Sequence, residues 1–245
     1  MRLVLLLATL LAALGVFALG ARAQEPVGRY CAANAPSTLL LIDRTTPYDD
    51  ADRAAIRETM SGVVEHLGDS ERLVVATIEN HYSVSRDVFD ACNPGCLDRS
   101  LFTNCSELRA NAERPEFRRR LFLAVQPLTR NTSELPNSDI TGTIARQTQR
   151  RGRAFTRVVI YSDMLENSQA LPWPTFRDQP IAQLMAVVRQ YNLIPNVRGA
   201  TVTISGFGRL HDPGRPPLAA AIDFKVRAFW AQYFSAGGAR ATQFD

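Results

Sequence analysis

The sequence predicts an α/β fold, with an open, mostly parallel sheet, one antiparallel edge strand, and helices on both faces. Short apolar runs suited to buried strands alternate along the chain with segments whose apolar residues recur at helical spacing. Such alternation is typical of parallel sheets, because each crossover helix packs back onto the sheet. Two strand candidates instead follow one another across a short polar turn, which predicts a hairpin at one edge.

The first residues are typical of a secretory signal peptide. Arg2 gives a positive start, residues 3–20 are almost entirely apolar, and a small-x-small cleavage site ends at Ala23. We therefore expect a signal peptide over 1–23, one domain over 24–245, no transmembrane span after cleavage, and a periplasmic or secreted protein. An uncleaved anchor is the alternative, because the apolar run reaches the lower length limit of a spanning helix.

A buried strand and an amphipathic helix come first in the predicted domain. Residues 38–43 form an apolar run ending in Asp43, which suits a parallel strand that brings a carboxylate to its C-terminal end. Acidic residues suited to the first turn of a helix come next. The apolar residues that then recur at helical spacing are Ile56, Met60, Val63, Val64 and Leu67.

The predicted hairpin and a loop-rich stretch follow. Residues 72–79 predict the second strand, and residues 84–91 predict a shorter, alternating strand after the polar turn. Residues 93–112 contain proline, glycine and several asparagines and predict a loop. A helix is expected from Pro115 to Val125, because proline is favoured in the first turn.

Another helix and strand lie in the middle of the chain. A loop over 129–137 leads to Ser138, a suitable N-cap for a short helix over 139–150. Residues 157–163 repeat the first strand pattern, because an apolar run again ends in an aspartate, Asp163.

The last third of the sequence predicts a loop, a helix, a strand and a closing helix. The loop covers residues 171–180, and the helix after it has Ile181, Leu184, Met185, Val188 and Tyr191 on one face. Residues 200–205 form the last clear strand. An apolar stripe over 218–233 then predicts the closing helix.

The charge pattern does not favour a nucleic-acid partner. The formal net charge of the whole sequence is +4, and two of its arginines lie in the predicted leader. The arginine clusters at 118–120 and 146–157 are not interleaved with stacking aromatic residues. We therefore interpret both clusters as solvated helix faces.

Four cysteines indicate disulfides in an oxidising compartment. Cys31, Cys92, Cys96 and Cys105 are an even set in a chain with a secretory leader, which favours two bridges. Zinc binding is the alternative, but none of the three histidines stands at a finger-like spacing to the cysteines. The residues alone leave three pairings open.

Polar residues follow the two runs that end in aspartate, where the ligand site of an open α/β sheet lies. They are Asp43, Thr45 and Thr46 after the first strand, Ser138 before its helix, and Asp163 and Glu166 after the later strand. Oxygen ligands from separate loops suit Mg²⁺. Each group also has a purely structural alternative, as a helix cap or as an acceptor for backbone N–H groups in a turn.

At these residues the chain resembles the von Willebrand factor A (integrin I-like) family, and the order of elements matches over about residues 37–234. The metal-ion-dependent adhesion site of that family combines an Asp-x-Ser-x-Ser motif, a Thr from a middle loop, and an Asp after the fourth strand. Here Asp43 and Thr45 match the first two motif positions, Ser138 the middle loop, and Asp163 the last position. Pro47 occupies the third motif position without a side-chain oxygen, which makes the site degenerate.

The resemblance implies a von Willebrand A or Rossmann-like arrangement that binds another envelope or extracellular protein, assisted by Mg²⁺ or Mn²⁺ at these four residues. It also implies that Cys31 and Cys92 lie at the sheet end opposite this site. The implied disulfides are Cys31–Cys92 and Cys96–Cys105.

An enzyme is the competing interpretation. The sequence contains no Gly-x-Ser-x-Gly elbow, Walker A motif or dinucleotide fingerprint. A Mg²⁺-dependent phosphohydrolase that uses Asp43 and Asp163, or another hydrolase with His81 or His211 as its base, is the alternative function. We expect a binding module and assign no catalytic residue, because no nucleophile-base pair is visible.

Overall fold

The structure is a computed structural model that describes residues 30–31, 35–97, 105–130, 134–150, 155–208 and 218–245. The predicted signal peptide over 1–23 lies outside the described residues. The strands are β1 (Ser37–Asp43), β2 (Arg72–Ile78), β3 (Asp87–Cys92), β4 (Arg157–Tyr161), β5 (Thr201–Ser205) and β6 (Ala241–Phe244). They form one sheet in the order β3-β2-β1-β4-β5-β6, in which only β3 runs antiparallel to its neighbour.

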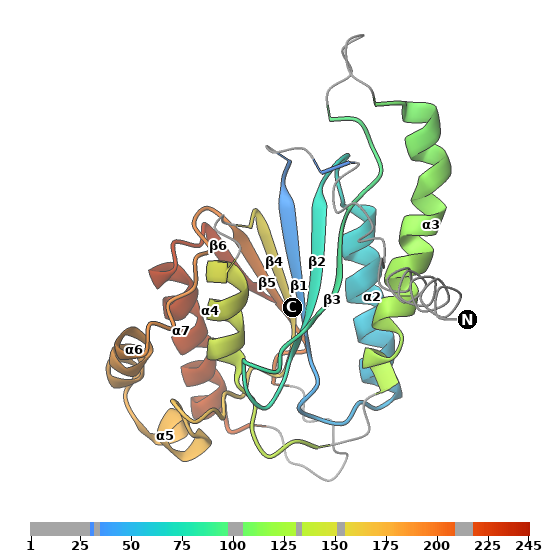
Figure 1. The fold of residues 1–245 in the computed structure, drawn as a ribbon. Coiled ribbons are helices and arrows are strands. Elements are labelled where there is room, and N and C mark those ends of the chain that lie inside the picture. The colour runs from blue at the N-terminus through green and yellow to red at the C-terminus, as the bar shows by residue number, and fades with distance from the viewer. Residues whose placement is uncertain (1–29, 32–34, 98–104, 131–133, 151–154, 209–217) are drawn as a thin grey trace, which may run out of the picture.

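Helices cover both faces of this sheet (Figure 1). They are α2 (Asp50–Glu65), α3 (Glu107–Val125), the 3₁₀ turn η2 (Leu128–Arg130), α4 (Ile140–Arg150), α5 (Trp173–Asp178), α6 (Ile181–Gln190) and α7 (Ala220–Ala236). Helices α2 and α3 lie on one face, and α4, α6 and α7 lie on the other. The predicted fold class, with its parallel sheet and single antiparallel edge strand, is confirmed.

Alternate side chains of β1 supply two hydrophobic cores. Leu39 and Leu41 pack into the core beneath α4, α6 and α7, whereas Leu40 and Ile42 pack into the core beneath α2 and α3. A strand that is buried on both faces has a nearly continuous apolar sequence, and β1 was therefore predicted correctly. The central place of β1 puts Asp43 in the middle of the C-terminal edge of the sheet.

The prediction for the segment before Val125 was wrong in two respects. Helix α3 begins at Glu107, so the predicted loop over 93–112 ends earlier, and Pro115 lies inside the helix rather than at its start. Ser106 is the N-cap and accepts a hydrogen bond from the backbone of Arg109 at 3.4 Å. Burial of apolar residues on one helix face compensates for the single backbone hydrogen bond that proline removes.

The 3₁₀ turn η2, helix α5 and strand β6 were missed, and one strand begins later than predicted. Helix α5 lies in the expected loop over 171–180, and its Phe176 packs edge-on against Phe229 with ring centroids 4.8 Å apart. Strand β6 extends the sheet beyond β5, although 200–205 was expected to be the last clear strand. Strand β3 begins at Asp87 instead of Val84, because the Ser85 hydroxyl donates to the Thr77 carbonyl at 2.6 Å and prolongs the turn.

Both implied disulfides are confirmed, at the end of the sheet where β1 begins. Cys31 pairs with Cys92 and Cys96 with Cys105, with Cα–Cα distances of 5.2 and 5.7 Å. Cys92 lies opposite Arg72, which pairs with the first residue of β1, so Asp43 lies at the other end of the sheet.

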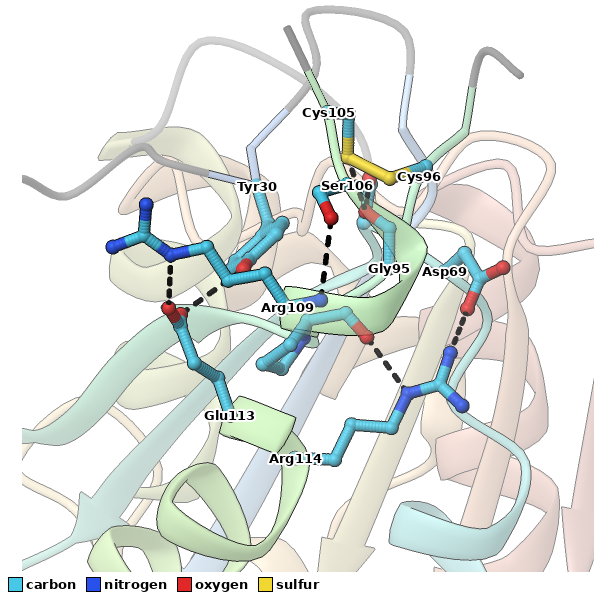
Figure 2. The surroundings of a disulfide bond; sticks show 11 residues. Tyr30, Asp69, Gly95, Cys96, Cys105, Ser106, Arg109, Glu113 and Arg114 are labelled. Atoms are coloured by element: carbon cyan, nitrogen blue, oxygen red, sulfur yellow. Dashed lines mark hydrogen bonds and ion pairs between the residues drawn. A yellow bond between two sulfur atoms is a disulfide. The ribbon is translucent and has the colours of Figure 1, made fainter. Parts of the chain in front are cut away.

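Helix α3 is tied to this disulfide-bonded end by polar contacts (Figure 2). Arg114 donates to the Asp69 carboxylate at 2.6 Å and to the Pro94 carbonyl at 2.8 Å. The Tyr30 hydroxyl donates to Glu113 at 3.0 Å. Among the helices that the structure describes, none is long and apolar enough to cross a membrane.

Candidate functional site

The Asp43 carboxylate is the centre of a buried cluster of hydroxyl groups at the C-terminal edge of the sheet. Its Oδ1 accepts hydrogen bonds from the backbone N–H and the hydroxyl of Thr45, at 2.9 and 2.6 Å. Its Oδ2 accepts from the hydroxyl of Ser162 at 2.6 Å and of Ser138 at 3.5 Å. All four side chains are buried. The structure therefore brings three of the four predicted metal ligands together.

Ser162 was missed as a member of this cluster. Strands β1 and β4 are parallel neighbours with Ile42 opposite Tyr161, so the next residues, Asp43 and Ser162, come side by side. The repeated pattern of an apolar run that ends in aspartate was a partial signal, because it placed an aspartate after each of two predicted strands, with Ser162 directly before the second one. Strand pairing had to be known before the serine could be selected.

Asp163, the fourth predicted ligand, is buried at the same edge and also shapes its own turn. Its Oδ1 accepts from the Leu165 backbone N–H at 2.9 Å, which is the structural role given as the alternative. The pKa of the Tyr48 phenol is raised well above its ordinary value, chiefly by burial and next by the charge of Asp43, with a smaller contribution from Asp163. Tyr48 therefore lies in the electric field of both aspartates.

The prediction that Ser138 is the N-cap of α4 was wrong. Asp139 performs this role, because its Oδ1 accepts from the Gly142 backbone N–H at 3.0 Å. Its Oδ2 accepts from the Tyr82 backbone N–H at 2.8 Å and so holds the turn after β2. The Ser138 side chain is directed to Asp43 instead, while its backbone forms a β-bridge with Asn167.

Glu166 lies beneath the first turn of α4, and in the described part of the chain its hydrogen bonds go to that turn and to Ser168, and not to the Asp43 cluster. Its Oε2 accepts from the backbone N–H groups of Ile140 and Thr141, at 3.1 and 2.9 Å, and its Oε1 accepts from the Thr141 hydroxyl at 3.1 Å. Complete burial raises the pKa of Glu166 to about 8, against the opposing effect of hydrogen bonds from the Ser168 side chain and from Thr141. Glu166 is thus a buried support for α4 in the described fold.

A pocket of about 900 Å³ is lined by Asp139, the residue after Ser138, and by none of the residues of the Asp43 cluster. Its walls come from the turn after β2, one face of α4, residues 168–170, and the residues that follow α6. His81 lines this pocket, where its ring stacks on Tyr82 with centroids 4.4 Å apart. The other histidine proposed as a base, His211, lies outside the described residues.

Gly142 allows the turn after β2 to approach α4 closely. A Cβ at this position would overlap the Asp139 carboxylate and lie 2.8 Å from Cδ1 of Tyr82. Gly142→Ala is therefore expected to destabilise the protein by roughly 1 to 2 kcal/mol, although alanine is the better helix former. Urea unfolding measures the change.

Gly62→Ala in α2 is the matched control, because a Cβ there would have no atom of another described segment within 4 Å. This control should stabilise the protein by up to about 1 kcal/mol. Equal gains from both variants would show that the close approach at Gly142 has no energetic consequence.

The donor set around Asp43 fits a hard divalent cation in its chemistry. It offers two carboxylates, from Asp43 and Asp163, and three hydroxyls, and Mg²⁺ prefers oxygen ligands of both kinds. The described residues contain no group of three or more His, Cys, Asp or Glu side chains placed to hold a metal. Any cation here would therefore depend on hydroxyl ligands in addition to the two carboxylates.

Comparison with known proteins adds no relative. No protein-family model matches the chain, and no curated protein matches its sequence. The argument for function therefore depends on the fold and on the site geometry.

Proposed function

We propose that the chain is an exported protein-binding module of the von Willebrand A type, with Mg²⁺ or Mn²⁺ held by Asp43, Thr45, Ser138 and Asp163. The observation that carries this proposal is the convergence of Thr45 and Ser138 on the Asp43 carboxylate at the central C-terminal edge of the sheet. Two disulfides support export, because such bridges are typical of oxidising compartments.

Ser162 supports the proposal despite the missing oxygen at Pro47. Its hydroxyl lies 2.6 Å from Asp43 Oδ2 and offers an oxygen from β4 where the motif lacks one. Thr45 and Ser162 also hold the carboxylate of Asp43 in one orientation, from opposite oxygens. A bound cation would supply a positive charge that attracts an acidic side chain of the partner.

The cation test uses thermal unfolding of the metal-stripped, oxidised protein. Saturating Mg²⁺ or Mn²⁺ should raise Tm by roughly 5 to 10 °C, since binding at about one hundred times Kd stabilises a domain by about 2.7 kcal/mol. Asp163→Asn should abolish the shift while leaving the apo fold intact, because asparagine retains an oxygen for the Leu165 N–H.

Asp178→Asn is the matched control, since it removes a carboxylate that pairs with Arg177 on the surface. This control should keep the full shift. The proposed cation site would be contradicted if neither Mg²⁺ nor Mn²⁺ changed the Tm of the wild type, or if Asp163→Asn kept the full shift.

Partner chemistry is tested separately with an immobilised poly-glutamate peptide as the probe. Binding in Mg²⁺ that disappears in EDTA and in Asp163→Asn is the expected result. Equal binding with Mg²⁺ and with EDTA would contradict a metal-bridged contact. A hydrolase centred on Asp43 has less support, because His81 lines the separate pocket beside α4.

A further inference from the structure

The pocket beside α4 is lined by an arginine side chain that has no acidic partner among the residues that the structure describes. Arg146 lines this pocket, and within the described residues its Nε is buried and donates no hydrogen bond. Other half-buried arginines are paired, as Arg72 is with Asp90 at 2.7 Å and Arg157 with Glu71 at 2.8 Å. A guanidinium left unpaired in a recess attracts an anion with planar oxygens.

The acid in the pocket wall, Asp139, forms no ion pair with Arg146 in the described part of the chain. Asp139 uses one oxygen for the Tyr82 backbone N–H and the other for the Gly142 backbone N–H, at 2.8 and 3.0 Å. Asp139 is the only acidic residue among the described residues that line the pocket. The positive charge of Arg146 is therefore available to a ligand.

Aromatic rings supply the rest of the recognition surface. The Arg146 guanidinium lies 5.8 Å from the centroid of the Tyr82 ring, which in turn stacks with His81. Tyr191 contributes a largely exposed ring from the residues that follow α6. Planar organic groups pack well on such rings.

The far wall is fixed by Gln149, the last lining residue along α4. Its Nε2 donates to the carbonyls of Asn192 and Ile194, at 3.2 and 2.7 Å. These bonds attach α4 to the segment that carries Tyr191. A pocket of about 900 Å³ has the size of sites that enclose small organic ligands.

We propose that this pocket binds a small aromatic carboxylate, whose carboxylate group pairs with Arg146 and whose ring packs on Tyr82 and Tyr191. This site shares no side chain with the Asp43 cluster. It can therefore be tested independently of the cation proposal.

Isothermal titration with 4-hydroxybenzoate tests the proposal, with the neutral 4-hydroxybenzamide and with phenyl phosphate as comparison probes. The carboxylate should bind at least tenfold more tightly than the amide, because a hydrogen bond to a charged group contributes more than a neutral one. Tighter binding of phenyl phosphate than of the carboxylate would overturn the assignment to carboxylates.

Arg146→Gln should weaken binding of 4-hydroxybenzoate at least tenfold, whereas Arg189→Gln, which removes an exposed charge from α6, should not. Tyr82→Leu leaves the charge of Arg146 in place and should weaken the binding of 4-hydroxybenzoate and 4-hydroxybenzamide by similar factors. Binding that is unchanged in Arg146→Gln, or no binding of 4-hydroxybenzoate at millimolar concentration, would overturn the proposal.

Discussion

Replacing Cys31 and Cys92 together with alanine is expected to lower the free energy of unfolding by about 4 kcal/mol. The two cysteines are 61 residues apart, so their bridge closes a long loop in the unfolded chain, and the stabilisation grows with loop length. Cys92 is also the last residue of the edge strand β3, so the bridge fastens that strand. Urea unfolding of the oxidised proteins measures the difference.

Cys96→Ala with Cys105→Ala is the matched control. Only 9 residues separate this pair, and the same loop argument gives a loss of about 2.5 kcal/mol. Wild-type protein treated with a thiol reductant should be less stable than either double variant. A larger loss from the short loop than from the long one would contradict the loop-length explanation.

The parts of the fold that the sequence predicted well are those whose burial leaves a clear pattern. Strands β1 and β4 are dominated by apolar residues in the sequence because helices cover both of their faces. Helix α2 has apolar residues on one face, and Asp49 with Asp52 forms its capping box. At these elements the local sequence preference and the burial in the fold favour the same secondary structure, so one sequence is enough to predict them.

The elements that were missed depend on contacts from far along the chain. Strand β6 is four residues long and only partly buried, and Phe244 finds its partner in Phe207, with ring centroids 5.2 Å apart. Helix α5 is short and begins after Pro172 without a side-chain cap. Neither segment carries a local signal strong enough to compete with the loop pattern around it.

The candidate site was predicted only in part, because some of its contacts are local in sequence and others depend on how distant segments pair. Asp43 and Thr45 are two residues apart, so their contact follows from local sequence. Ser162 joins them only through the register of β1 and β4, and the choice between Ser138 and Asp139 as the cap depended on the turn that carries Tyr82. Ser138 therefore contacts the Asp43 cluster, whereas its neighbour Asp139 caps α4. Capping preferences alone do not distinguish these two roles.

Burial of Glu166 is expected to make the stability of the protein fall between about pH 4.5 and pH 8. The pKa of Glu166 is raised from 4.5 to about 8, first by burial, and the nearby charge of Asp139 also raises it. In this window the folded protein retains a proton that the unfolded chain has released, so each rise in pH favours unfolding. The contribution of Glu166 is complete below pH 4.5 and is lost as pH rises through its folded pKa, with a total of roughly 3 to 5 kcal/mol.

Glu166→Gln isolates this effect, because its amide oxygen can accept from the Ile140 and Thr141 N–H groups without ionising. Urea unfolding at pH 5, 6.5 and 8 should show the wild type losing stability relative to this variant as pH rises. The difference between the two proteins isolates Glu166, because the rest of the sequence is unchanged. Glu58→Gln changes an exposed carboxylate of α2, and its free energy of unfolding should vary with pH in parallel with that of the wild type. If the Glu166→Gln curve is also parallel, Glu166 is ionised in the folded protein, and the hydrogen bonds from α4 outweigh its burial.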